Sequence, residues 1–206
     1  MGKPILKITV RILACAVIFS GLAVIAGWEF GVPGLLSVYS GWMNIKFNTA
    51  VVFVFSGILL YFIARSREGD VDKAQVVIPI VSLVIILFIG TSFFSSILGI
   101  RTEVEDLFIE GQTGSITAVA GKPSMPMMLG FLLIASAGLL TVAGAKTISL
   151  KLKVTGLILV LIGAAAAAGY LFNFPPLYYY IKGINSGMAF YTAVLFILLG
   201  GGLLCL

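Results

Sequence analysis

The largest group of carboxylate side chains lies near the middle of the chain. Four carboxylates, Glu103, Glu105, Asp106 and Glu110, fall within eight residues. Carboxylate oxygens are ligands that hard cations prefer, but Ca²⁺ takes six to eight oxygens and its helix–loop–helix sites have a fixed spacing that this segment lacks. We therefore interpret the segment as a solvated acidic loop, and a site for a cation or another ligand is the alternative.

Most other site chemistry is excluded by the residues that the sequence lacks. It contains no histidine, which excludes imidazole zinc sites, histidine-ligated haem and histidine general bases. Cys15 and Cys205 are far apart within apolar runs, so they are typical of small buried side chains rather than of a disulfide or a redox pair. The sequence has no phosphate-binding loop, nucleophile elbow or zinc-protease motif. We expect a protein that is not an enzyme and that holds no cofactor or metal.

Hydroxyl and amide side chains at two expected helix starts are the remaining candidates. Thr49 and Thr192 open two similar apolar segments, and Asn48 precedes Thr49. A threonine hydroxyl in a membrane helix can bond a nearby backbone carbonyl or cross to a neighbouring helix, and asparagine is a favoured helix cap. We predict helix packing for the two threonines and capping for Asn48, and the lining of a ligand site is the alternative.

Composition predicts the elements that carry these residues. Of the 206 residues, 60% are hydrophobic and 10% are charged, and the mean hydropathy is +1.17. This predicts an all-α, polytopic membrane protein, because the polar surface is too small for a soluble domain and continuous apolar runs are not the alternating segments of a barrel. A membrane helix needs about 20 apolar residues. Six segments without Asp, Glu, Lys or Arg are predicted transmembrane helices: 12–28, 48–64, 76–98, 125–144, 154–172 and 187–206.

The chain repeats part of its own sequence. The pattern Phe-x-Thr-Ala-Val-x-Phe-x-x-x-Gly occurs at 47–57 and at 190–200, an offset of 143 residues. The turns before it share Gly, aromatic, Phe, Pro and Leu positions at an offset of 142, and the middle third is a diverged copy that has lost Thr-Ala. Such internal similarity is typical of repeated structural units. We predict one membrane domain, 1–206, made of three parallel helix–outer loop–helix repeats at approximately 1–70, 71–146 and 147–206.

Lysine and arginine predict the orientation, because they accumulate on the cytoplasmic side of membrane proteins. If both termini share a side, that side has nine of these residues and the other has four. This predicts cytoplasmic termini. The net charge of +5 reflects this asymmetry and not a basic stripe, so the expected partner is the lipid bilayer and not nucleic acid.

Several short motifs are distributed along nearly the whole chain. They are the Gly-Trp-x-Phe-Gly turn at 27–31, the Asn-Thr-Ala entry at 48–50, and Leu-Gly-Ile, Asp-Leu-Phe and Gly-Lys-Pro at 98–100, 106–108 and 121–123. Together they resemble the N-terminal multi-helix membrane region of bacterial and archaeal sensor proteins, which precedes PAS domains and a histidine kinase or a diguanylate cyclase. The chain departs from that pattern at 124–130, which lacks Asn-Thr-Ala, and it contains no kinase residues.

The resemblance implies a sensory, signal-input module in the plasma membrane of a prokaryote, as part of a two-component system. It would be non-catalytic by itself, either the N-terminal portion of a sensor or a free-standing relative, with a homodimer or a cytoplasmic effector domain as partner. Two other classes stay open. A small-solute transporter or channel usually shows intramembrane charges or broken helices. A structural subunit would pack on a partner through small residues, and the chain has 24 glycines.

Overall fold

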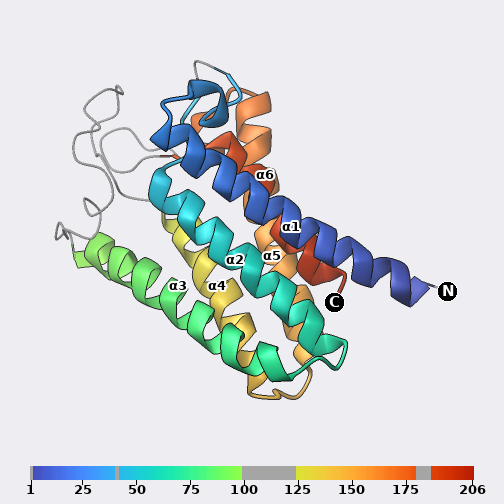
Figure 1. The fold of residues 1–206 in the computed structure, drawn as a ribbon. Coiled ribbons are helices and arrows are strands. Elements are labelled where there is room, and N and C mark those ends of the chain that lie inside the picture. Colours follow the sequence, from blue (N-terminus) through green and yellow to red (C-terminus); the bar gives the residue numbers. More distant parts are fainter. Residues whose placement is uncertain (1, 40–41, 99–123, 180–186) are drawn as a thin grey trace.

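The protein is a bundle of helices. The computed structural model describes residues 2–39, 42–98, 124–179 and 187–206 (Figure 1). The elements are α1 (Gly2–Glu29), η1 (Pro33–Leu35), α2 (Phe47–Arg67), α3 (Asp72–Leu98), α4 (Met125–Val142), α5 (Ile148–Leu171), η3 (Pro175–Tyr178) and α6 (Phe190–Leu204), where η marks short 3₁₀ turns. These ranges contain no strand, so the prediction of an all-α chain is confirmed for them.

Five of the described helices, α1 to α5, are long and apolar enough to cross a membrane. The last one is shorter than the predicted segment 187–206, because α6 has 15 residues and so a length of about 22 Å. Met188 and Ala189 come before the helix starts, and both are buried. The chain therefore enters the bundle in an extended form and becomes helical only at Phe190.

Consecutive helices pair as three hairpins. Packing is most extensive within the pairs α1–α2, α3–α4 and α5–α6. Further contacts join α2 to α3, α4 to α5 and α6 to α1, and α2 also touches α4 and α6. Figure 1 shows the short connections 68–71 and 143–147 at one end of the bundle, which we name the turn end. The opposite end, with the described residues 30–39, 42–46, 172–179 and 187–189, is the loop end.

Three phenylalanines meet in the interior of the bundle. Phe53 of α2, Phe131 of α4 and Phe196 of α6 are each fully buried. Their ring centroids lie 4.9 Å apart for Phe53 and Phe131, 5.3 Å for Phe53 and Phe196, and 5.0 Å for Phe131 and Phe196. Each hairpin thus contributes one ring, from its second helix, to a single aromatic cluster, which we name the phenylalanine triad.

Glycines allow close packing in the first and third hairpins. A methyl group built on Gly21 would lie 2.9 Å from the Ala50 carbonyl oxygen, and one built on Gly163 would lie 2.5 Å from that of Ala193. A second pair of contacts also corresponds: Gly57 with the Ala14 oxygen at 3.0 Å, and Gly200 with the Gly156 oxygen at 2.5 Å. Both pairs are related by the sequence offsets of 142 and 143, so α1–α2 and α5–α6 pack through equivalent positions.

Equivalent hydrogen bonds also hold the loops before α2 and α6. The Trp28 indole Nε1–H donates to the Ile45 carbonyl oxygen at 3.0 Å, and the Tyr170 hydroxyl donates to the Met188 carbonyl oxygen at 2.9 Å. Two backbone bonds correspond as well, from Ile45 N–H to the Leu36 oxygen at 3.0 Å and from Met188 N–H to the Tyr178 oxygen at 2.7 Å. In each loop these bonds therefore hold a buried residue, Ile45 or Met188, just before the second helix of the hairpin begins.

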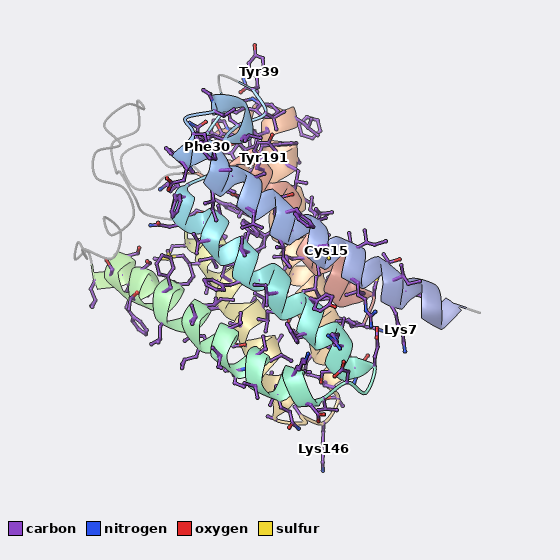
Figure 2. All side chains as sticks on the ribbon, in the orientation of Figure 1. Lys7, Cys15, Phe30, Tyr39, Lys146 and Tyr191 are labelled. Carbon is purple, nitrogen blue, oxygen red and sulfur yellow. The ribbon has the colours of Figure 1, made fainter. Side chains whose placement is uncertain are left out.

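Ion pairs lie at the turn end. Arg11 of α1 pairs with Glu68, and Arg65 pairs with Asp70 within the α2–α3 connection. Figure 2 shows Lys146 at this end, whereas Phe30 and Tyr39 lie at the loop end. Arg11 and Arg65 are thus both paired with carboxylates of the α2–α3 connection.

Candidate functional site

The acidic segment lies outside the part of the chain that the structure describes. Glu103, Glu105, Asp106 and Glu110 lie outside the described residues, so their interpretation stays a prediction. Within the described ranges, no group of three or more His, Cys, Asp and Glu residues could hold a metal ion. In this part of the chain, the remaining candidates for a site are hydroxyl, amide and backbone N–H groups.

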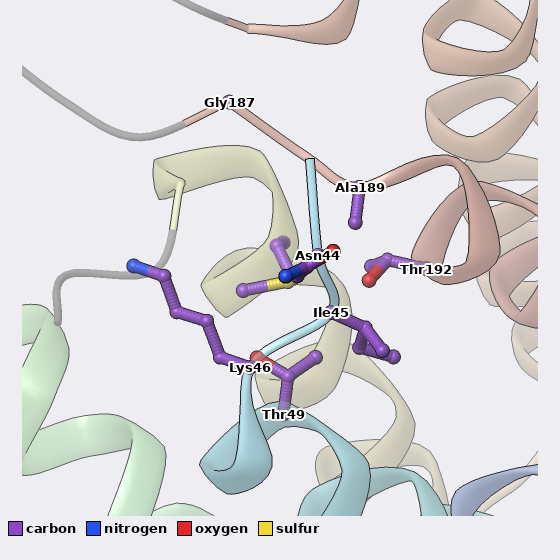
Figure 3. A pocket seen from close by; sticks show the side chains of 8 residues that line it. Asn44, Ile45, Lys46, Thr49, Gly187, Ala189 and Thr192 are labelled. Atoms are coloured by element: carbon purple, nitrogen blue, oxygen red, sulfur yellow. The ribbon is translucent and has the colours of Figure 1, made fainter. Parts of the chain in front are cut away.

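A small pocket opens at the loop end between the starts of three helices (Figure 3). Thr49 of α2, Met127 of α4 and Thr192 of α6 line it, and each is the third residue of its helix. Five further lining residues come from the segments that precede these helices: Asn44, Ile45, Lys46, Gly187 and Ala189. Its volume of about 10 Å³ has room for about one water molecule.

Helix geometry directs backbone N–H groups toward this pocket. Lys46, Ser124 and Ala189 occupy the N-cap positions of α2, α4 and α6, and none of them makes a side-chain cap hydrogen bond. The first N–H groups of a helix have no partner inside the helix and carry the positive end of its dipole. Lys46 is the only charged residue among the eight lining residues. The three helix starts therefore contribute positive partial charge at this end of the bundle.

The two predicted threonines come together at this pocket. Thr49 is 4% exposed and Thr192 is 1% exposed. Figure 3 shows the two side chains at the pocket wall, on the first turns of α2 and α6. Their location fits the alternative raised for them, the lining of a ligand site, while the helix-packing role stays a prediction.

Asn48 does not occupy the cap position predicted for it. The helix begins one residue earlier, at Phe47, so Asn48 is the second residue of α2 and Lys46 is the N-cap. The residue just before that N-cap, Ile45, is held by hydrogen bonds with Trp28 and Leu36.

Ser124 is a polar group at this end that sequence reasoning missed. It is 1% exposed, and its Oγ has no hydrogen-bond partner. It precedes α4 as Lys46 precedes α2 and Ala189 precedes α6. One signal could have found it, since each of these residues lies seven positions before a phenylalanine of the triad.

Aromatic rings connect the first and third hairpins at the loop end. The Trp42 ring centroid lies 4.9 Å from that of Tyr170 and 4.9 Å from that of Phe190. Tyr170 also stacks on Tyr178 at 4.4 Å. Burial raises the pKa of the Tyr179 phenol above its ordinary value of 10, so the phenol stays neutral near pH 7 and donates to the Ile162 carbonyl oxygen at 3.2 Å.

The eight described residues that line the pocket offer groups for binding and none arranged for covalent chemistry. A threonine hydroxyl becomes a nucleophile only beside a general base, and none of the eight lining residues supplies a carboxylate or an imidazole. Hydroxyls, an amide and backbone N–H groups instead suit a small ligand that accepts hydrogen bonds. Comparison of the chain with protein families, with curated proteins and with solved structures finds no match.

Proposed function

We propose that the protein is a sensory, signal-input module of a prokaryotic plasma membrane, non-catalytic by itself. In this proposal all six helices cross the bilayer, including the shorter α6, and both termini are cytoplasmic. Three parallel hairpin repeats build the domain. The equivalent glycine contacts and loop hydrogen bonds of α1–α2 and α5–α6 support the repeat. The charge asymmetry, nine basic residues against four, supports the orientation.

The observation that carries this proposal is the shared pocket at the loop end. Its wall takes one residue from the first turn of the second helix of every hairpin: Thr49, Met127 and Thr192. A ligand there touches all three hairpins at once. If it binds one packing of the helices better than another, it shifts the population between them, and the rigid helices carry that shift to the turn end. A homodimer partner or a cytoplasmic effector would respond there.

The interior next to the pocket argues against conduction. Phe53, Phe131 and Phe196 each lie four residues, or about one helical turn, beyond a residue of the pocket wall. All three are fully buried and in mutual contact. Ion and proton pathways through membranes are usually lined by ionisable side chains, and the three second helices present aromatic rings at this level instead. A transporter is therefore the weaker alternative.

The test measures transport and helix movement on the same preparation. The full chain, with spin labels at Arg67 of α2 and Leu204 of α6, is placed in liposomes of prokaryotic lipid composition. A panel of small anions, amino acids and sugars is added on the loop side. A signal-input module should change the distance distribution between the labels for at least one solute, with no solute flux above that of protein-free liposomes. Flux without any change in the label distances contradicts the proposal.

A further inference from the structure

We infer that the start of α5 binds the headgroup of an anionic phospholipid, with an acyl chain of that lipid along the exposed apolar side of the helix. This inference goes beyond the proposed function. It requires that α5 crosses a bilayer, for which the helix is long and apolar enough. It does not depend on signal input, or on the side of the membrane that the turn end faces.

The two short connections at the turn end differ in their charges. The first connection with its flanking helix ends, 65–73, has three basic and three acidic residues. Two of these carboxylates, Glu68 and Asp70, form ion pairs with arginines. The second, 146–153, has three basic residues and no acidic one, and no Asp or Glu occurs anywhere in 111–206. The positive charge at the start of α5 therefore has no counter-charge in its own hairpin.

The cations of this second segment are Lys146, Lys151 and Lys153, and all three are exposed. None of them forms an ion pair with another residue that the structure describes. Figure 2 shows Lys146 pointing away from the bundle at the turn end. Lysine stems lie along apolar surface while the ammonium group stays at the polar boundary. At a membrane surface, clustered basic side chains of this kind bind anionic headgroups.

An exposed apolar stripe begins beside these lysines and follows α5. Its residues recur at helical spacing and are between 48% and 62% exposed: Leu150, Val154, Leu157 and Leu161. Helix geometry places Lys151 on one side of the stripe and Lys153 on the other. The stripe is about 16 Å long at about 1.5 Å per residue, or about half of a hydrocarbon core of roughly 30 Å. It therefore has the depth of one leaflet, which an acyl chain spans.

Charge and apolar surface together select the occupant. A second copy of the chain on the same stripe would bring the lysines of both copies to one level, and like charges repel. A soluble acidic protein would neutralise the lysines but would not cover a stripe that faces hydrocarbon. An anionic phospholipid does both, because its phosphate and its alkyl chains belong to one molecule.

Fluorescence quenching by labelled lipids tests the inference on the full chain. In a Cys15→Ala/Cys205→Ala protein, a fluorophore is attached to a single cysteine, Leu157→Cys in α5 or Ile80→Cys in α3. The liposomes are made of phosphatidylcholine and contain a small fraction of nitroxide-labelled phosphatidylglycerol or nitroxide-labelled phosphatidylcholine. At position 157 the anionic lipid should quench with an apparent affinity at least about threefold above that of the zwitterionic lipid. Equal quenching by the two lipids overturns the inference and leaves an acidic protein as the partner of the lysines.

Position 80 is the matched control for position 157. Leu157 is the tenth residue of α5 and Ile80 is the ninth residue of α3, so the two fluorophores lie at similar depth. Both side chains are exposed, but α3 follows the connection whose charges are balanced. The two lipids should therefore quench almost equally at position 80. The same preference at both positions would show a general attraction to the turn end and would overturn a site at α5.

Charge variants assign the preference to the two lysines beside the stripe. Lys151→Gln/Lys153→Gln should reduce the affinity ratio at position 157 to about one, whereas Lys151→Arg/Lys153→Arg keeps both charges and should keep the ratio. Arg67→Gln/Lys73→Gln removes as many charges from the other connection and should leave the ratio unchanged. Equal loss in this control and in the Lys151→Gln/Lys153→Gln protein contradicts the assignment.

Two measurements on the chain without charge variants separate the remaining explanations. The preference should fall as sodium chloride is raised to about 1 M, since the Debye length shortens to about 3 Å, and a preference that ignores salt contradicts a charged site. Soluble glycerol phosphate should not displace the labelled lipid, because it lacks the acyl chain. Displacement would show a site for free phosphate and overturn the lipid.

The spin-label experiment keeps this inference distinct from the proposed function. A preference for the anionic lipid, without any change in the label distances for any solute, would leave the lipid site standing and contradict signal input. Helix movement in a protein that shows no lipid preference would do the reverse.

Discussion

Trp28 and Tyr170 perform the same task with different side chains. One donates an indole N–H to the Ile45 carbonyl oxygen, and the other donates a phenol O–H to the Met188 carbonyl oxygen. Both bonds hold a buried residue that lies just before the second helix of a hairpin. An aromatic residue at a membrane interface is usually ascribed to the headgroup region. Here the donor atom holds the backbone just before α2 and α6 begin. Loss of the donor should therefore loosen the segments that line the pocket.

We expect Tyr170→Phe to destabilise the fold by about 1 kcal/mol, the size of a single hydrogen bond inside a membrane protein. Trp28→Phe should cost more, because it removes ring volume as well as the N–H. Reversible unfolding in mixed micelles measures both. Tyr39→Phe is the control, since Tyr39 is 65% exposed and should be neutral. An unaffected Tyr170→Phe protein would show that the bond to Met188 contributes nothing to stability.

Individual residues were predictable only where the repeat marked them. Thr49 and Thr192 stand at the same place in two copies of one motif, and the structure brings them to one pocket. Met127 and Ser124 escaped notice because the middle copy has lost Thr-Ala, and no local pattern shows that three helix starts converge. Asn48 is the second residue of α2 and not its N-cap, and no local pattern shows that the helix starts one residue earlier.

At the scale of elements, close helix pairs depend on glycines that no other residue can replace without movement. A Cβ on Gly163 would lie 2.5 Å from the Ala193 oxygen, and one on Gly200 would lie 2.5 Å from the Gly156 oxygen. Both neighbours are backbone atoms, which cannot swing aside as a side chain can. The α5–α6 pair would have to separate to admit a methyl group.

We therefore expect Gly163→Ala and Gly200→Ala each to destabilise the bundle by about 1–3 kcal/mol, the usual cost of overpacking. Gly201→Ala is the matched control, because nothing lies within 4 Å of a Cβ at this helical position. It should be neutral or slightly stabilising, since alanine is the better helix former. Steric-trap unfolding in bicelles can compare the three. A larger loss at Gly201 than at Gly163 would contradict the packing described for α5 and α6.

Helix existence was predictable from apolar runs, but helix ends were not. The predicted segment begins at 76, whereas α3 begins at Asp72 and contains Pro79 in its interior. Three of the four residues 72–75 are polar, so they give no apolar signal although they belong to the helix. The opposite error occurred at 187–206, because apolar residues that are extended and buried, such as Met188, look the same in a sequence as helical ones.

The whole molecule is joined at the phenylalanine triad, where one ring from each hairpin meets the other two. We expect Phe53→Ala, Phe131→Ala and Phe196→Ala each to destabilise the fold by about 3 kcal/mol or more, because each leaves a cavity in the centre. Phe94→Ala is the control, since Phe94 is 65% exposed on a predicted membrane span and should lose little. Thermal unfolding of the four variants in one detergent makes the comparison. Equal losses at Phe94 and at the triad would refute a shared core.

Orientation in the membrane is the remaining property of the whole molecule, and cysteine labelling can determine it. In a protein with Cys15→Ala and Cys205→Ala, a single cysteine replaces Ser37 at the loop end or Lys73 at the turn end. Because basic residues gather on the side of the termini, the positive-inside rule places Ser37→Cys outside and Lys73→Cys in the cytoplasm. A membrane-impermeant maleimide added to whole cells should label the first directly and the second only after permeabilisation. Labelling of Lys73→Cys in intact cells would contradict the predicted orientation and would place the loop-end pocket on the cytoplasmic side.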